Sequence, residues 1–449
     1  MLANEIAALF HGGAAVRQRD VIFDLTRLAT RFSRPAPNGI DRVDIGYAEH
    51  FLSEGRGGQG ALFGPAGLRA VDNRAGRAIV QAVAGHWREP GSAEEDEAYV
   101  RLMARLEGHD TEAHRHPPAR RKANTLRSLG RLMRHGRIVG RSGLFPGRSL
   151  SRTVPRGATY LNINQFPLWL DWYFRWLDRR PDVKAVFFIH DLLPITYPEF
   201  FPASEAQRHE GRMEVLARRG HGIIVASDDT RRALERYFRH CNRPLPPTCV
   251  IPLPPSPSFT QPEGVAAPPT RRPYFVTVGT IEPRKNQLLL LNIWRELAQR
   301  LGDRTPMLLL VGARGWDNEN VVDMLERCRP IEPFVVEISG LSTPALGRLM
   351  AGARAVLLPT LAEGYGLPAV EAQAAGAPLI VSDRLGLRHP LGGRTIVLDP
   401  LDGPGWRDAI AAHACSESVP GIDEVRPKVE ATSGWKLHIE HAEQFIQSL

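Results

Sequence analysis

One segment, residues 355–382, constrains the fold of this chain more than any other. It begins with an apolar stretch, 355–358, that is typical of a buried strand, and it continues into a helix-forming stretch, 369–375. The turn between them contains two glycines, which let the backbone approach a ligand, and a proline suited to a first helical turn. Such a unit can receive a phosphate at the helix N-terminus. We therefore predict an α/β unit with Glu363 in the turn and Glu371 in the helix.

The rest of the chain alternates apolar and amphipathic stretches in the same way. Because this alternation places helices on both faces of parallel sheets, we expect two Rossmann-like units. The predicted strands are 21–24, 159–163, 184–189, 222–225, 274–279, 307–311, 335–337, 355–358 and 379–381. Residues 38–43 are predicted to be a loop that leads into a helix at 44–52, and a plain helix start capped by Asp41 or Asn38 is the alternative. Ser227 is predicted to cap a helix at 229–237.

A proline-rich stretch, 244–273, divides the chain. We place a first unit at 1–258, with an insertion at about 86–156, and a linker at 259–273. A second unit follows at 274–430, and a final helix occupies 431–449.

The bulk properties favour a cytoplasmic protein. No run of about 18 apolar residues is present that would span a membrane. Residues 1–10 contain an acidic residue and lack the basic N-terminal region of a secretory signal. The four cysteines show no metal-ligand spacing, so we expect a reducing compartment and no metal.

The net charge of +8 is unevenly placed. Residues 115–156 contain twelve Lys or Arg and no Asp or Glu, with leucines near helical spacing at 126–133. This pattern fits a basic amphipathic helix that attaches to an anionic membrane surface or contacts an acidic lipid diphosphate. A solvated insertion is an equal alternative. Nucleic acid binding is disfavoured, because no aromatic residues interleave the charges.

Cationic and polar residues follow several predicted strands. Arg284 and Lys285 follow strand 274–279 and can neutralise a diphosphate, the arginine in a bidentate manner. His190 and Asp191 end strand 184–189, where ligands bind in open parallel sheets. The aromatic group Trp169, Trp172, Tyr173 and Trp176 fits core packing better than stacking on a sugar.

The full string around Glu363 and Glu371, with Glu282-Pro283-Arg284-Lys285-Asn286, resembles the donor-site signature of the retaining GT-B glycosyltransferases of family 4. His190-Asp191-Leu192 and Gly39-Ile40-Asp41-Arg42-Val43 are similar to segments of its bacterial mannosyl- and rhamnosyltransferases. The resemblance implies an α/β GT-B fold, with two Rossmann-like domains and a cleft between them.

The resemblance also implies roles for individual residues. Glu371 would bind the nucleotide ribose, and Glu363 would bind the hydroxyls of the donor sugar. Arg284, Lys285, Glu363 and His190 are the predicted catalytic residues. The predicted donor-binding residues are Glu371, Gly366, Leu367, Gly364, Tyr365, Gly340 and Leu341. An acceptor or phosphate loop would contain Gly39, Arg42 and Asp191.

The implied activity is sugar transfer with retained configuration, and mannose from GDP-mannose is favoured over dTDP-rhamnose and UDP-sugars. No cofactor or metal is expected. The acceptor would be a saccharide, free or linked to a polyprenyl diphosphate, in surface polysaccharide synthesis. The enzyme would be cytoplasmic and possibly peripheral on the inner face of the cell membrane. Two alternatives remain open: an inactive nucleotide-sugar-binding partner protein and a GT-B epimerase.

Overall fold

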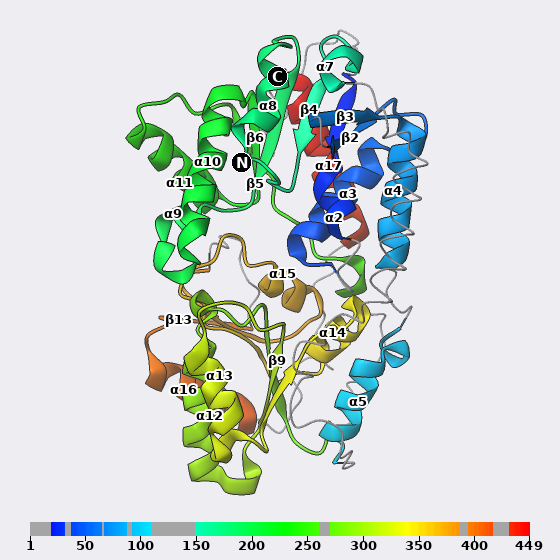
Figure 1. The fold of residues 1–449 in the computed structure, drawn as a ribbon. Coiled ribbons are helices and arrows are strands. Elements are labelled where there is room, and N and C mark those ends of the chain that lie inside the picture. The colour runs from blue at the N-terminus through cyan, green and yellow to red at the C-terminus, as the bar shows by residue number, and fades with distance from the viewer. Residues whose placement is uncertain are drawn as a thin grey trace.

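The computed structural model describes residues 19–31, 37–64, 67–87, 92–108, 149–259, 270–385, 394–415 and 431–449. These residues form two lobes, each built around one sheet (Figure 1). The prediction of two α/β units with parallel sheets is thereby confirmed. The basic run predicted to be an amphipathic helix falls mostly within 109–148, outside the described residues.

The first lobe contains a seven-stranded sheet in the order β3-β2-β1-β4-β5-β6-β7, parallel except between β2 and β3. The strands are β1 (Val21–Asp24), β2 (Gln59–Gly64), β3 (Gly67–Val71), β4 (Thr159–Asn162), β5 (Lys184–Ile189), β6 (Gly222–Val225) and β7 (Thr248–Val250). Sequence reasoning predicted none of β2, β3 and β7, and β7 lies within the stretch that was read as a proline-rich divider of the chain. The three-residue β7 adds to the sheet edge beside β6.

Helices cover both faces of the first sheet. They are α2 (Thr26–Arg31), α3 (Gly39–Phe51), α4 (Asn73–His86), α7 (Leu150–Thr153), α8 (Asp171–Asp178), α9 (Leu193–Thr196), α10 (Ala203–Arg219) and α11 (Asp228–His240), with the short turn η2 (Pro198–Phe200). Successive residues of β1 enter different cores, Phe23 on one face and Ile22 on the other. Strands buried on both faces are continuously apolar, as observed here.

The second lobe contains a parallel six-stranded sheet in the order β10-β9-β8-β11-β12-β13. Its strands are β8 (Tyr274–Val278), β9 (Met307–Val311), β10 (Val335–Ile338), β11 (Val356–Leu358), β12 (Leu379–Ser382) and β13 (Thr395–Leu398). Its helices are α12 (Gln287–Leu301), α13 (Glu319–Arg327), α14 (Thr343–Ala351), α15 (Leu367–Ala374) and α16 (Gly403–Cys415). Four short turns complete it: η3 (Pro257–Phe259), η4 (Pro283–Lys285), η5 (Gly302–Arg304) and η6 (Arg329–Ile331).

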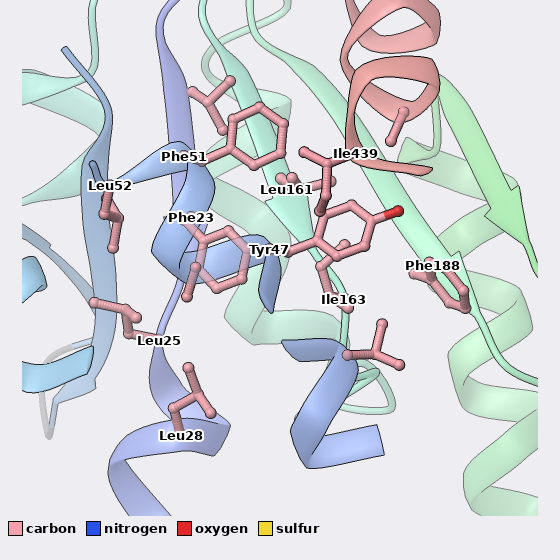
Figure 2. Packing of buried hydrophobic residues seen from close by; sticks show 14 of the residues in the cluster. Phe23, Leu25, Leu28, Tyr47, Phe51, Leu52, Leu161, Ile163, Phe188 and Ile439 are labelled. Atoms are coloured by element: carbon pink, nitrogen blue, oxygen red, sulfur yellow. The ribbon is translucent and has the colours of Figure 1, made fainter. Parts of the chain in front are cut away.

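The final helix, α17 (Ala431–Ser448), returns to the first lobe. Its Ile439, Ala442 and Ile446 are buried in the core formed by β1, α3 and β5. Figure 2 shows Ile439 near Tyr47 and Phe51 of α3. The hydroxyl of Tyr47 lies 2.8 Å from Nε2 of His438, which fastens α17 to α3.

Part of the predicted insertion packs in the second lobe. The turn η1 (Ala93–Glu95) and helix α5 (Glu97–Leu106) lie beside α14, although α4 before them belongs to the first lobe (Figure 1). Tyr99, Leu102 and Leu106 are buried in the core of the second lobe. Helix α5 thus packs in the second lobe, although it follows a helix of the first lobe in the sequence.

Candidate functional site

The predicted glycine turn lies between β11 and α15. Gly366 has a positive φ of 84° and forms the N-cap of α15, which begins at Leu367 with Pro368 in its first turn. A Cβ atom on Gly366 would lie 3.0 Å from Cγ of Leu385, so both backbone angle and space favour glycine. Glu363 lies in the turn and Glu371 in the first turns of α15, as predicted.

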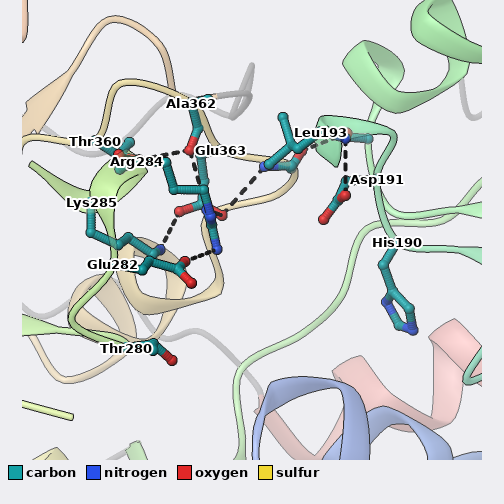
Figure 3. Close-up of polar contacts among 12 residues, drawn as sticks. His190, Asp191, Leu193, Thr280, Glu282, Arg284, Lys285, Thr360, Ala362 and Glu363 are labelled. Carbon is teal, nitrogen blue, oxygen red and sulfur yellow. Dashed lines mark hydrogen bonds and ion pairs between the residues drawn. The ribbon is translucent and has the colours of Figure 1, made fainter. Parts of the chain in front are cut away.

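Two cations hold the carboxylate of Glu363. Nη1 of Arg284 donates to it at 3.1 Å, and Nζ of Lys285 donates to its other oxygen (Figure 3). Arg284 also forms an ion pair of 2.7 Å with Glu282. Burial alone would raise the pKa of Glu363, but the charges of Lys285 and Arg284 outweigh burial and lower this pKa to about 2. Glu363 is therefore an anion at neutral pH.

The loop that carries these cations is attached to the glycine turn. Asn286 follows them with φ of 55°, and its side-chain amide donates to Pro359 O at 3.2 Å and Pro400 O at 3.0 Å. The backbone N–H of Leu361 donates to Arg284 O at 2.7 Å. These bonds place the cations beside the start of α15.

His190 and Asp191 of the first lobe follow β5, and the backbone O of His190 and the side chain of Asp191 lie next to Gly364 of this turn. A Cβ atom on Gly364 would lie only 2.8 Å from Cβ of Asp191, so the two lobes touch here. In Figure 3 Asp191 lies between His190 and the group around Glu363. Nε2 of His190 lies 2.9 Å from Ile163 O, and burial lowers the pKa of His190 to about 4. The imidazole is therefore neutral at pH 7.

Arg42 reaches Glu371 from the opposite lobe. Its Nη1 donates to Glu371 Oε1 at 2.9 Å, and the carboxyl side chain is only 5% exposed. Arg42 belongs to α3, which begins at Gly39, so the predicted loop at 38–43 is wrong. The side chains of Asn38 and Asp41 form a reciprocal capping box that starts the helix earlier.

Two further contacts join the glycine turn to the first lobe. The hydroxyl of Ser227 donates to Gly364 O at 3.0 Å, and it also caps α11 as predicted. The hydroxyl of Tyr365 donates to Leu253 O at 2.7 Å, and its ring is buried in a first-lobe core. The structure thus gives Tyr365, predicted to bind the donor, a packing role between the lobes.

Sequence reasoning missed a contact on the other side of the lobe boundary. The indole N–H of Trp316 donates to Phe200 O at 3.0 Å, and its ring lies 6.1 Å from that of Phe201. Nothing in the local pattern of either segment indicates this pairing, because the residues are separated by more than a hundred positions.

A cavity of about 630 Å³ lies between the lobes beside α15. Four predicted site residues contribute to its wall, together with Thr343 at the start of α14 and several apolar side chains. The predicted residues are Gly39, Arg42, Leu367 and Glu371. Gly340, with φ of 82°, and Leu341 lie in the loop just before Thr343.

Two guanidinium groups of the site retain unused donors. Among the described residues, Nε of Arg42 and Nε of Arg284 are buried and have no hydrogen-bond partner. Buried polar groups are normally satisfied, so these unpaired donors leave part of each guanidinium group without compensation for its burial.

In the described parts of the chain, no group of three or more His, Cys, Asp or Glu residues is arranged to hold a metal ion. No helix in the same parts is long and apolar enough to cross a membrane.

Comparison with known proteins identifies the family. Residues 178–425, more than half of the chain, match a model described as "Family 4 Glycosyltransferase in conflict systems". The chain belongs to the family 4 glycosyltransferases. The resemblance seen in the glycine turn and in the Arg284 segment is thereby confirmed.

Curated relatives carry names of sugar transfer. O-antigen chain mannosyltransferase B of Escherichia coli is 30% identical over 234 residues, which cover 51% of this chain and 60% of that protein. The serotype-specific mannosyltransferase WbdA of Escherichia coli is 26% identical over 214 residues, or 44% of this chain and 26% of that protein. The chain therefore spans only part of the length of these relatives.

Solved structures share the GT-B fold. Anabaena Alr3699/HepE in complex with UDP and glucose has a TM-score of 0.58, at 16% identity, and the match covers 96% of this chain and all of that one. Sucrose-phosphate synthase from Thermosynechococcus elongatus has a TM-score of 0.51, also at 16% identity, and covers 96% and 95% of the two chains. The predicted architecture of two Rossmann-like domains with a cleft is confirmed.

Proposed function

We propose that this protein is a retaining glycosyltransferase that moves a sugar, mannose in the favoured case, from a nucleotide-sugar donor to a saccharide acceptor. The observation that carries the proposal is the cationic pair Arg284 and Lys285, held by Glu363 beside the N-terminus of α15. The names of the matched relatives support mannose as the sugar.

The chemistry follows from the charges of the site. Breaking the bond between sugar and diphosphate leaves negative charge on the leaving group. Arg284 and Lys285 would stabilise that charge. The leaving phosphate would take the acceptor proton on the same face of the sugar. This route requires no paired acid and base of the glycosidase kind.

The carboxylates would select the donor. Glu371 would accept hydrogen bonds from ribose hydroxyls, and Glu363 from sugar hydroxyls, since ionised carboxylates act only as acceptors. The backbone N–H groups of Gly366 and Leu367 would bind the distal phosphate. We favour GDP-mannose as the donor, and we propose no metal or other cofactor.

The acceptor side would be the first lobe, where Asp191 lies against the glycine turn and His190 precedes it in the chain. Neutral His190 could bind a sugar hydroxyl through its free ring nitrogen. We propose that the acceptor is a saccharide of a surface polysaccharide, carried on a polyprenyl diphosphate at the inner face of the cell membrane. Vesicle flotation tests the membrane part, and equal recovery with neutral and anionic vesicles would contradict it.

Calorimetry with GDP-mannose, UDP-glucose and dTDP-rhamnose tests the donor proposal. We expect the wild type to bind GDP-mannose most tightly and Glu371→Ala to bind it at least about tenfold more weakly, for loss of a buried charged hydrogen bond. Glu332→Ala, which changes an exposed carboxyl distant in sequence from the turn, is the control. No binding of any donor by the wild type would refute the proposal.

Product analysis separates transfer from the alternatives. Incubation of donor and a mannose-containing acceptor should yield the elongated saccharide with retained anomeric configuration. A new sugar nucleotide formed from donor alone would indicate an epimerase. Donor binding without any product would indicate an inactive partner protein.

A further inference from the structure

Asp96, in the inserted segment, lies between the starts of two helices. Its Oδ1 accepts hydrogen bonds from Ala98 N at 2.8 Å and Tyr99 N at 3.3 Å and so caps α5. Its Oδ2 accepts a bond of 2.7 Å from the backbone N–H of Ser342, which is the N-cap of α14. The residue is only 7% exposed, so water competes little for these bonds.

The Ser342 bond fixes the end of a loop that borders the cavity. The loop follows β10, contains Gly340 in a left-handed conformation, and ends at Thr343, which contributes to the cavity wall beside Glu371. Ligands of open parallel sheets bind at the carboxyl ends of the strands, where this loop lies. A glycine-containing loop is mobile unless other contacts hold it.

Asp96 itself is held firmly in place. Tyr99 and Leu102 on α5 are buried in the second core, and Glu94 forms an ion pair of 3.1 Å with Arg348 of α14. Arg271 N donates to Leu106 O at 3.0 Å, so the end of α5 is also joined to the chain entering β8. The carboxylate therefore acts as a fixed acceptor for the loop.

We propose that Asp96 is a positioning residue that holds the loop 340–343 in its ligand-binding arrangement, so that the inserted segment sets the affinity for the nucleoside diphosphate part of the donor. This inference rests on the proposed function. The physical basis is preorganisation: a loop that is already ordered loses less conformational freedom when the ligand binds.

Two substitutions separate this role from capping. Asp96→Asn keeps an oxygen that can cap α5, but its amide group then faces the Ser342 N–H, and two donors oppose each other. Asp96→Ser can also cap α5, but the serine side chain is too short, and has only one oxygen, to bond Ser342 at the same time. The matched control is Asp72→Asn, which changes the exposed N-cap of α4 in the first lobe.

Hydrogen exchange and calorimetry with GDP and UDP provide the test in the full chain. In both Asp96 variants the amide hydrogens of 340–343 should exchange faster than in wild type. Both variants should also bind the preferred nucleotide at least about fivefold more weakly, which is the lower end of typical couplings between distinct sites. Asp72→Asn should change neither quantity, and thermal midpoints report any general loss of stability.

The outcomes distinguish the two proposals. Unchanged exchange at 340–343, or unchanged nucleotide affinity in a wild-type background that does bind, overturns the role of Asp96. Equal weakening by Asp72→Asn also overturns it. A wild type that binds no nucleotide refutes the proposed donor site, while the exchange data still decide whether Asp96 holds the loop.

Discussion

Replacing Glu363 by Gln removes the anion that holds Arg284 and Lys285. The pKa of Glu363 is about 2, against an ordinary value of 4.5. At roughly 1.4 kcal/mol per pKa unit, this difference corresponds to about 3 kcal/mol of native-state stability. Because the pKa is lowered on folding, this stabilisation is complete above pH 4.5 and is lost as the pH falls toward 2. The glutamine variant has no such group to titrate.

Urea unfolding followed by tryptophan fluorescence measures this effect. At pH 7 we expect Glu363→Gln to be less stable than wild type by about 3 kcal/mol, and the difference to shrink by about 1 kcal/mol at pH 4 and about 2 at pH 3. Glu332→Gln, at an exposed carboxyl, should show no comparable change. A stability difference that is absent at pH 7, or identical at pH 7 and pH 3, would refute the electrostatic reasoning.

Two other perturbations test the contacts between the lobes, and a third tests the ionisation of His190. Arg42→Ala should weaken the binding of GDP-mannose measured by calorimetry, and a double-mutant cycle with Glu371→Ala should give a coupling of about 1–3 kcal/mol, since the pair is largely buried; strict additivity would contradict it. Gly364→Ala should cost about 1–3 kcal/mol in urea unfolding, because its Cβ would meet Asp191 at 2.8 Å; an unchanged midpoint would show that the lobes separate freely. Burial lowers the pKa of His190 from 6.5 to about 4, so the native state favours the neutral imidazole. The stability that this provides is complete above pH 6.5 and is lost as the pH falls toward 4. The transfer rate should then show no ionisation from His190 between pH 7 and 8, and His190→Asn should leave the shape of the pH profile there unchanged.

Local chemistry explains why the glycine turn was predictable. Gly366 is favoured by its own positive φ, and Pro368 suits the first turn of α15 because an N–H there has no partner within the helix. The side chain of Ser227 caps α11 by accepting a hydrogen bond from the backbone N–H three residues later. The apolar strands were also readable, because burial on both faces leaves little polar sequence within them. The early start of α3 is encoded by Asn38 and Asp41, and the structure confirms the capped helix start that was the alternative to a loop at 38–43.

Other features depend on residues that are distant in the chain. Arg42 and Glu371 are 329 positions apart, and Asp96 and Ser342 are 246 positions apart. The sequence around each of these four residues does not indicate which distant residue it contacts. Helix α5 likewise packs in the second lobe because its apolar residues are buried in the core there, although its neighbours in the sequence belong to the first lobe.

The sequence by itself determined the family, most strands of the two largely parallel sheets and the glycine turn, because these depend on strand burial, backbone angles and helix capping within short stretches. Only the tertiary structure decided which residues meet across the lobes, that Tyr365 packs between them, and that the inserted segment holds a loop of the cavity. Those contacts arise when distant surfaces are buried together and their charges and donors must be satisfied at once.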